Sequence, residues 1–275
     1  MTRLPTPAIP ESARAVGHPL WLAFVSGCGV GLLGGLVGLG GAEFRLPLIV
    51  GLFGFAALQA VIVNKAMSLI VVLVAIPARM LAVPFADVLV EWTVIVNLLA
   101  GSLAGAWLGA TWATRMRAAT LYRVLGALLV GIAIVFAAEH GGAIPAVSLP
   151  PLAQAVTGLV AGFGIGVVAA IMGVAGGELL IPTIVLLYGV DTKLAGSLSL
   201  LVSLPTMIVA FLRYSRDQAF TVLGQHPGFV AAMSGGSVAG AFLGALLLGV
   251  VSDALLVPVI VALLLVSAVN MWRHA

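Results

Sequence analysis

Charged side chains are scarce in this chain of 275 residues, where Asp, Glu, Lys and Arg together make up only 8%. Soluble proteins carry about 25% of these residues. Hydrophobic residues reach 62%, so a soluble fold would have too little polar surface to cover itself. The scarcity of charge therefore excludes a soluble protein and predicts an all-α polytopic membrane protein, with the lipid bilayer as its solvent.

Cysteine is nearly absent as well, because Cys28 is the only one, and this excludes an intrachain disulfide or a cysteine-based metal site. The sequence also lacks a phosphate-binding loop, a HExxH motif and a nucleophile elbow. We therefore expect no enzyme activity, no cofactor and no ATP-driven pumping. No metal site is expected either, since the four histidines lie at segment ends without ligand spacing: His18, His140, His226 and His274.

Basic residues outnumber acidic ones by 12 to 9, but they do not gather into one patch, so we expect no nucleic-acid partner. If the N-terminus is in the cytoplasm and each apolar segment counts as one crossing, the loops alternate between the two sides of the membrane. Lys193 then falls outside, whereas the following residues all fall on the cytoplasmic side: Arg3, Arg14, Arg115, Arg117, Arg123, Arg213, Arg216 and Arg273. The positive-inside rule thus predicts a multi-pass protein of the inner (plasma) membrane with both termini cytoplasmic.

An internal repeat runs through the chain at a constant offset of 135 residues. The stretch Gly38–Pro47 returns as Gly173–Pro182, and Gly101–Gly105 returns as Gly236–Gly240. Each half holds five apolar segments, and because five is odd, the second half is inverted relative to the first. Two inverted-topology repeats that each contain a glycine-broken segment are typical of secondary transporters, whose site lies between the repeats.

The repeat divides the chain into a cytoplasmic tail (1–18), a first membrane repeat (19–140), an outer linker (141–151) and a second membrane repeat (152–275). The predicted segments are 20–41, 44–57, 61–82, 91–113, 119–138, 152–176, 179–189, 194–212, 228–250 and 254–272. The second segment of each half has about 14 residues or fewer, which is too short to cross the membrane unaided. We interpret these two segments as broken or re-entrant helices with Pro47 and Pro182 in or near their first turns.

The two glycine motifs are where the sequence places the binding site. A glycine cluster before a helix leaves backbone N–H groups unpaired at the positive end of the helix dipole. Two such N-termini that meet near the middle of the membrane predict an anion-binding pocket, while a pair of structural kinks is the alternative. The residues assigned to the pocket from these motifs are Gly40, Gly41, Ala42, Gly176 and Gly177.

Glu43 and Glu178 occupy equivalent positions directly after the two glycine clusters. An ionisable side chain inside the membrane is costly and is by default a functional candidate. We therefore assign both carboxylates to the pocket as candidates for proton coupling. The alternative is that each carboxylate binds the free amides of its own helix, and the sequence leaves both interpretations open.

Two cations break the symmetry of the repeat, since Arg45 aligns with Leu180 and Lys65 aligns with Leu200. A guanidinium in the first turn of a broken helix can hold a small oxyanion through paired hydrogen bonds. The alternatives for Arg45 are an ion pair with Glu43 or an extended side chain that reaches the headgroups. Lys65 is assigned to the pocket too, with the alternative that it marks the inner end of its helix.

Neutral hydrogen-bonding side chains complete the predicted pocket. They lie at the start of the helix that follows each short segment, where they can face an anion. Helix serines often bond their own backbone instead, which is the structural alternative. The residues assigned are Asn64, Ser68, Ser197, Ser199 and Ser203.

At Gly38–Pro47 and Gly173–Pro182 the chain resembles the TauE/SafE family of sulfite exporters and related anion permeases. That family carries one glycine-rich motif followed by a proline in each half, and then a hydroxyl-rich helix such as Ala195–Thr206 here. Ala42 stands where a third glycine is usual. The resemblance implies secondary transport of a small anion, namely sulfite, a sulfonate or a related organosulfur acid.

We therefore expect a permease that works by alternating access between its inverted repeats. Its expected partners are a small anionic substrate, the lipid bilayer and protons, and a homodimer is left open. Two alternatives remain at this point. One is an anion channel of the same architecture, and the other is a non-transporting membrane subunit that senses an anion.

Overall fold

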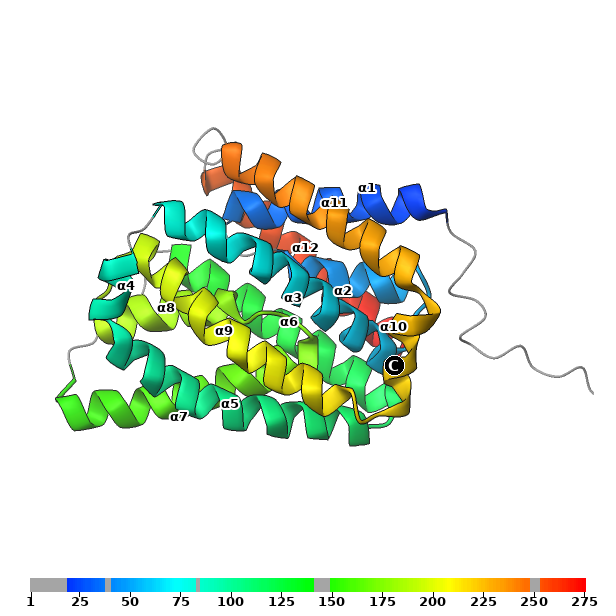
Figure 1. The fold of residues 1–275 in the computed structure, drawn as a ribbon. Coiled ribbons are helices and arrows are strands. Elements are labelled where there is room, and N and C mark those ends of the chain that lie inside the picture. The colour runs from blue at the N-terminus through cyan, green and yellow to red at the C-terminus, as the bar shows by residue number, and fades with distance from the viewer. Residues whose placement is uncertain (1–18, 38–40, 83–84, 141–148, 248–252) are drawn as a thin grey trace, which may run out of the picture.

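The computed structural model describes residues 19–37, 41–82, 85–140, 149–247 and 253–275, and within these ranges the chain forms helices and no strand (Figure 1). The helices, in chain order, are α1 (Leu20–Val37), α2 (Ala42–Gly51), α3 (Ala57–Ala82), α4 (Phe85–Val90), α5 (Trp92–Arg115), α6 (Ala118–His140), α7 (Pro151–Met172), α8 (Gly177–Tyr188), α9 (Thr192–Tyr214), the 3₁₀ turn η2 (Gln218–Thr221), α10 (Val222–Gln225), α11 (Pro227–Leu246) and α12 (Asp253–Arg273).

Six helices in the described ranges are long and apolar enough to cross a membrane. They are α3, α5, α6, α7, α9 and α11. The two helices that follow the glycine motifs are shorter, with 10 residues in α2 and 12 in α8, or about 15 and 18 Å. Neither reaches across a hydrocarbon layer of about 30 Å. The prediction of an all-α polytopic membrane protein is confirmed, and a short helix follows each glycine motif as expected.

The short helices begin earlier than the sequence suggested. Gly41 and Gly176 have φ of 72° and 89°, a left-handed backbone that glycine adopts without steric cost, and each starts a helix at the next residue. Pro47 and Pro182 therefore lie inside α2 and α8 and not in their first turns, so that placement was wrong. The short connectors α4, η2 and α10 were not predicted.

Each proline has a consequence for the residue four positions before it. Proline has no backbone N–H, so it cannot donate the helical hydrogen bond to that carbonyl. The two carbonyls concerned belong to Glu43 and Glu178, because Pro47 and Pro182 each follow a glutamate by four residues. The backbone carbonyls of both glutamates therefore lack their helical hydrogen-bond donor. Each glutamate thus brings two kinds of acceptor to the start of its helix, this carbonyl and a carboxylate.

Glycines that recur every four residues form a stripe along one side of α1, α5, α7 and α11. These glycine stripes bring two pairs of helices into backbone contact, namely α1 with α11 and α5 with α7. A Cβ on Gly31 would lie 2.2 Å from the carbonyl oxygen of Ser237, and a Cβ on Gly166 would lie 2.3 Å from that of Ser102. Small residues permit such approach in lipid. Gly31 and Gly166 differ by 135 positions, as do Ser237 and Ser102. The repeat is therefore present in the helix contacts as well as in the amino-acid sequence.

Equivalent helices run in opposite directions in Figure 1, where α1 starts on the right and α7 starts on the left. The helix ends that carry Arg115, Arg213 and Arg273, at α5, α9 and α12, lie on the side where α1 begins. The C-terminus lies on that side too (Figure 1). One end of the helix bundle is therefore rich in arginine.

Candidate functional site

Two helix N-termini form the base of the candidate site. No side chain caps α2 or α8, and the first turns bond only from Phe44 and Leu179 onward, to the carbonyls of Gly41 and Gly176. Within the part of the chain that is described, the first amides of both helices bond to no backbone carbonyl and are candidates for binding a ligand. Gly41, Ala42, Gly176 and Gly177 lie at these starts, while Gly40 is outside the described residues.

Asn64 joins the two motifs through a single nitrogen atom. Its Nδ2 donates to the carbonyl oxygen of Ala42 at 3.0 Å and to that of Met172 at 3.2 Å. Ala42 begins α2, and Met172 ends α7 directly before the second glycine motif. Segments that are far apart in the sequence therefore meet at this amide, as the prediction of one shared pocket requires.

Four charged side chains are fully buried among the described residues. Their exposed fractions are 1% for Glu43, 0% for Arg45, 0% for Lys65 and 5% for Glu178. Glu43 lies within electrostatic range of Glu178 and Arg45, and Lys65 lies within range of Glu178. The four groups therefore form one cluster, with two cations facing two carboxylates.

The carboxylates have no hydrogen-bond donor. None of the four carboxylate oxygens of Glu43 and Glu178 is within hydrogen-bonding geometry of a described group. Arg45 and the backbone amide of Glu43 both act electrostatically on the Glu43 carboxylate, so the two alternatives, an Arg45–Glu43 ion pair and carboxylates that bind the free amides of their own helices, stay predictions. A buried, unpaired carboxylate is costly, so these oxygens are available for a proton or a ligand.

Arg45 is held by neutral side chains. Its Nε donates to Asn64 Oδ1 at 2.8 Å, its Nη2 to Ser68 Oγ at 2.7 Å and its Nη1 to Ser237 Oγ at 3.2 Å. A longer bond of 3.5 Å joins Nη2 to the Asn64 carbonyl. These four bonds leave one of the five guanidinium N–H groups for another acceptor. Full burial also means that Arg45 does not reach the headgroups, which corrects that alternative.

Lys65 spans the two halves of the chain. Its Nζ donates to the carbonyl oxygens of Ala169 at 2.8 Å and Val174 at 2.6 Å. These carbonyls lie at the C-terminal end of α7, where the helix dipole is negative and favours a cation. Lys65 lies inside α3 and not at its inner end, so that alternative was wrong. Ser68 Oγ adds a bond to the Gly173 carbonyl at 3.2 Å.

The serines predicted in the second half differ from one another in their contacts. Ser197, Ser199 and Ser203 are all buried. Ser199 Oγ donates to the Gly196 carbonyl of its own helix at 2.8 Å, which is the structural alternative. Ser197 Oγ has no partner in the described part of the chain. Ser197 therefore keeps a free hydroxyl for a ligand, whereas the hydroxyl of Ser199 is occupied.

Ser237 is not among the predicted site residues, although its Oγ accepts a hydrogen bond from Arg45. Ser237 and Ser102 are repeat equivalents in the glycine stripes, and both are buried. Ser102 Oγ is 2.7 Å from Thr206 Oγ1 and so has a different partner. A hydroxyl kept in both copies of an otherwise apolar stripe was the signal available. No cluster of three or more His, Cys, Asp or Glu side chains suited to a metal occurs among the described residues.

Comparison with known proteins adds one finding. A sequence model of a known family, described as Sulfite exporter TauE/SafE, matches residues 23–271 of the chain. The match covers both glycine motifs and nearly all of the described helices. The chain matches no curated protein and no solved structure.

Proposed function

Because the chain belongs to the sulfite exporter TauE/SafE family, whose members are membrane transport proteins, we propose that it is a secondary transporter for a small anion. Sulfite, a sulfonate or a related organosulfur acid is the substrate class. The anion binds between the N-termini of α2 and α8, near the side chains of Glu43, Arg45, Lys65 and Glu178. We place the protein in the inner membrane with both termini in the cytoplasm, and we keep the repeat boundaries at 19–140 and 152–275.

The buried charge cluster is the observation that carries this proposal. Two cations and two carboxylates balance when all four are charged, and the site then attracts no net charge. A proton on Glu43 or Glu178 gives the cluster a net charge of +1 and makes room for a monoanion. Two protons make room for a divalent anion. Charge balance in a low-dielectric site thus links each negative charge on the substrate to one proton.

The arrangement of the helices supports alternating access. Equivalent helices run in opposite directions (Figure 1), and the α1–α11 and α5–α7 pairs are joined by backbone contact along glycine stripes. Each pair joins one helix from each repeat and is tight enough to move as one body, and the site lies where Asn64 and Lys65 connect α3 with α7. Breaking and remaking these few polar contacts is the step that changes access.

Ligand binding to the purified protein tests the substrate class. We expect one of sulfite, thiosulfate, taurine or sulfoacetate to raise the thermal midpoint, and acetate and chloride to leave it unchanged. An anion at 100 times its dissociation constant stabilises by about 2.7 kcal/mol, which is readily measured. Equal shifts with all the anions, or none with any, would contradict the proposed substrate class.

Coupling is tested by changing the two glutamates separately to glutamine. In proteoliposomes, we expect wild-type flux to increase as the pH falls, because protonation of a carboxyl group admits the anion. Glu43→Gln or Glu178→Gln removes one titrating group, so at least one variant should lose most of this pH dependence. A pH profile that both variants share with the wild type would exclude proton coupling through these residues.

The same vesicles separate a transporter from an anion channel. A transporter shows saturable flux and counterflow, in which unlabelled anion inside the vesicle drives uptake of labelled anion. A channel shows neither. Flux that stays linear with concentration and lacks counterflow would therefore favour the channel.

A further inference from the structure

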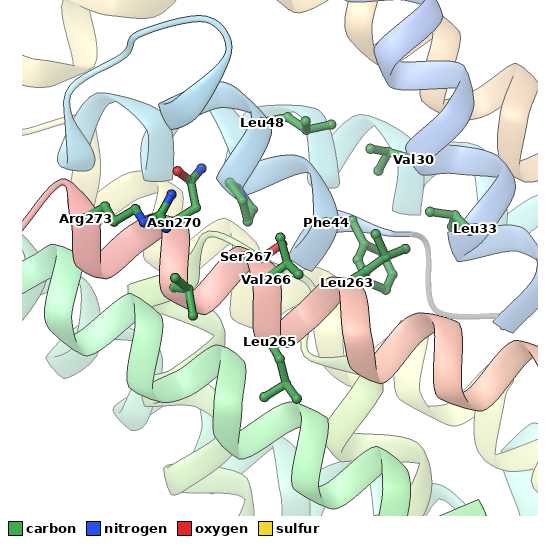
Figure 2. Close-up of a pocket in the computed structure, with 12 residues that line it drawn as sticks. Val30, Leu33, Phe44, Leu48, Leu263, Leu265, Val266, Ser267, Asn270 and Arg273 are labelled. Atoms are coloured by element: carbon green, nitrogen blue, oxygen red, sulfur yellow. The ribbon is translucent and has the colours of Figure 1, made fainter.

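A cavity with a volume of about 640 Å³ lies between α1, α2 and α12 (Figure 2). Most of its wall is apolar, with Val30 and Leu33 from α1, Phe44 from α2 and Leu263 from α12. No residue of the charge cluster lines it. It is therefore a separate space, which reaches the first turn of α2 only through Phe44.

The charged end of this cavity lies next to the end of α12. Asn270 and Arg273 line it there, and Ser267 adds a polar group midway along the wall, beside Val266 (Figure 2). Arg273 is exposed, and no described group accepts a hydrogen bond from it. The cavity thus combines an apolar wall with an unpaired cation at its mouth.

The length of the cavity matches one leaflet of a bilayer. Leu263 and Arg273 are ten positions apart in the helix, which is about 15 Å along the axis and about half of a hydrocarbon layer of 30 Å. Arg273 lies at the arginine-rich end of the bundle (Figure 1). The polar end therefore sits at headgroup level, and the apolar end lies near the middle of the membrane.

The repeat shows that this polar end is not required for helix packing. The equivalent helix α6 carries Ile132, Val135 and Ala138 where α12 carries Ser267, Asn270 and Arg273. The two helices hold equivalent places in the two halves and pack against each other. Three polar residues are therefore present in one copy only, and they all face the same cavity.

We propose that this cavity binds a membrane phospholipid with an anionic headgroup. One acyl chain lies along the apolar wall toward Phe44, and the phosphate binds Arg273 and Asn270. A small inorganic anion is a poor occupant, because an apolar wall does not replace its hydration. A zwitterionic lipid of the same chain length fits the wall but has no net charge to match Arg273.

Native mass spectrometry of the full-length protein in detergent tests this proposal. The probes are phosphatidylglycerol and phosphatidylcholine with identical acyl chains. We expect preferential retention of phosphatidylglycerol. Arg273→Gln should weaken its binding about fivefold, as about 1 kcal/mol per basic residue implies. The combined change Ser267→Ile, Asn270→Val and Arg273→Ala copies the α6 residues and should weaken it about tenfold or more, since hydrogen-bonding groups are lost too.

Arg117→Gln is the matched control, because Arg117 is an exposed arginine outside the cavity. It should leave lipid retention unchanged. Equal retention of the two lipids, or an equal loss of phosphatidylglycerol in Arg117→Gln and Arg273→Gln, would overturn the proposal. The proposal would also be overturned if sulfite bound to the wild-type protein and Arg273→Gln abolished that binding. Arg273→Gln changes only an exposed side chain, so it decides the matter even if the triple variant does not fold.

Discussion

Gly236→Ala is expected to destabilise the protein by about 3 kcal/mol or more, the upper end for overpacking in a rigid core. The added Cβ would lie 2.0 Å from the carbonyl oxygen of Phe24, 2.9 Å from its carbonyl carbon and 3.0 Å from the amide nitrogen of Cys28. All three are backbone atoms of α1, so no side chain can rotate away and the helices must separate. The thermal midpoint of the purified protein measures the loss.

The adjacent glycine provides the control. A Cβ on Gly235 meets only Phe24 Cε2 at 3.9 Å, which is ordinary contact. Gly235→Ala should therefore stay within about 1 kcal/mol of the wild type, the size of the intrinsic helix preference. Gly101→Ala, the repeat equivalent of Gly236→Ala, should cost about as much, because its Cβ would lie 2.1 Å from the Leu159 carbonyl. Similar midpoints for Gly235→Ala and Gly236→Ala would show that the helices can separate freely.

Arg45→Leu is expected to reduce transport at least about a hundredfold, equivalent to about 2.7 kcal/mol, while the protein still folds. Leucine is the residue at the equivalent position in the second half, Leu180. Removing one charge from a buried cluster leaves an uncompensated partner and costs stability, but a proton on Glu43 or Glu178 restores the charge balance here. The three hydrogen-bonding partners lost are neutral: Asn64, Ser68 and Ser237. Anion flux in proteoliposomes and the thermal midpoint are measured together.

A second substitution separates charge from geometry. Arg45→Lys keeps the positive charge but loses the planar fork that reaches α3 and α11 together. We expect it to restore little of the flux. If Arg45→Leu transported normally and kept its thermal midpoint, Arg45 would be a packing residue and the proposed site would have to move. Retained flux in Arg45→Lys alone would show that only the charge matters.

The sequence predicted those parts of the fold that depend on local spacing. The offset of 135 residues relates Gly101–Gly105 to Gly236–Gly240, and glycines of both stretches lie where helix backbones meet. The helix starts were less predictable. Proline is common in the first turn of helices, so Pro47 was predicted there. In the structure the left-handed backbone of Gly41 starts α2 at Ala42, five residues before that proline.

The contacts of the site were harder to predict, for a physical reason. Arg45 finds Ser237 at a separation of 192 residues, and no local pattern pairs a cation with a particular distant hydroxyl. Lys65 binds two backbone carbonyls, a group that every residue carries, so the sequence contains no signal for them. The repeat indicated that Arg45 and Lys65 have no cationic equivalent in the second half. It gave no indication that their side chains bind residues of the second half.

The hydrogen bond from Lys65 to Ala169 also has a consequence for how the protein is made. The two residues are separated by 104 positions, so at about 5–20 residues per second the ribosome reaches Ala169 roughly 5–20 s after Lys65. Throughout that interval α3 carries a lysine that has no acceptor inside the bilayer. Stable insertion of α3 must therefore wait for α7 or depend on shelter within the insertion machinery, and the first half released alone should be degraded.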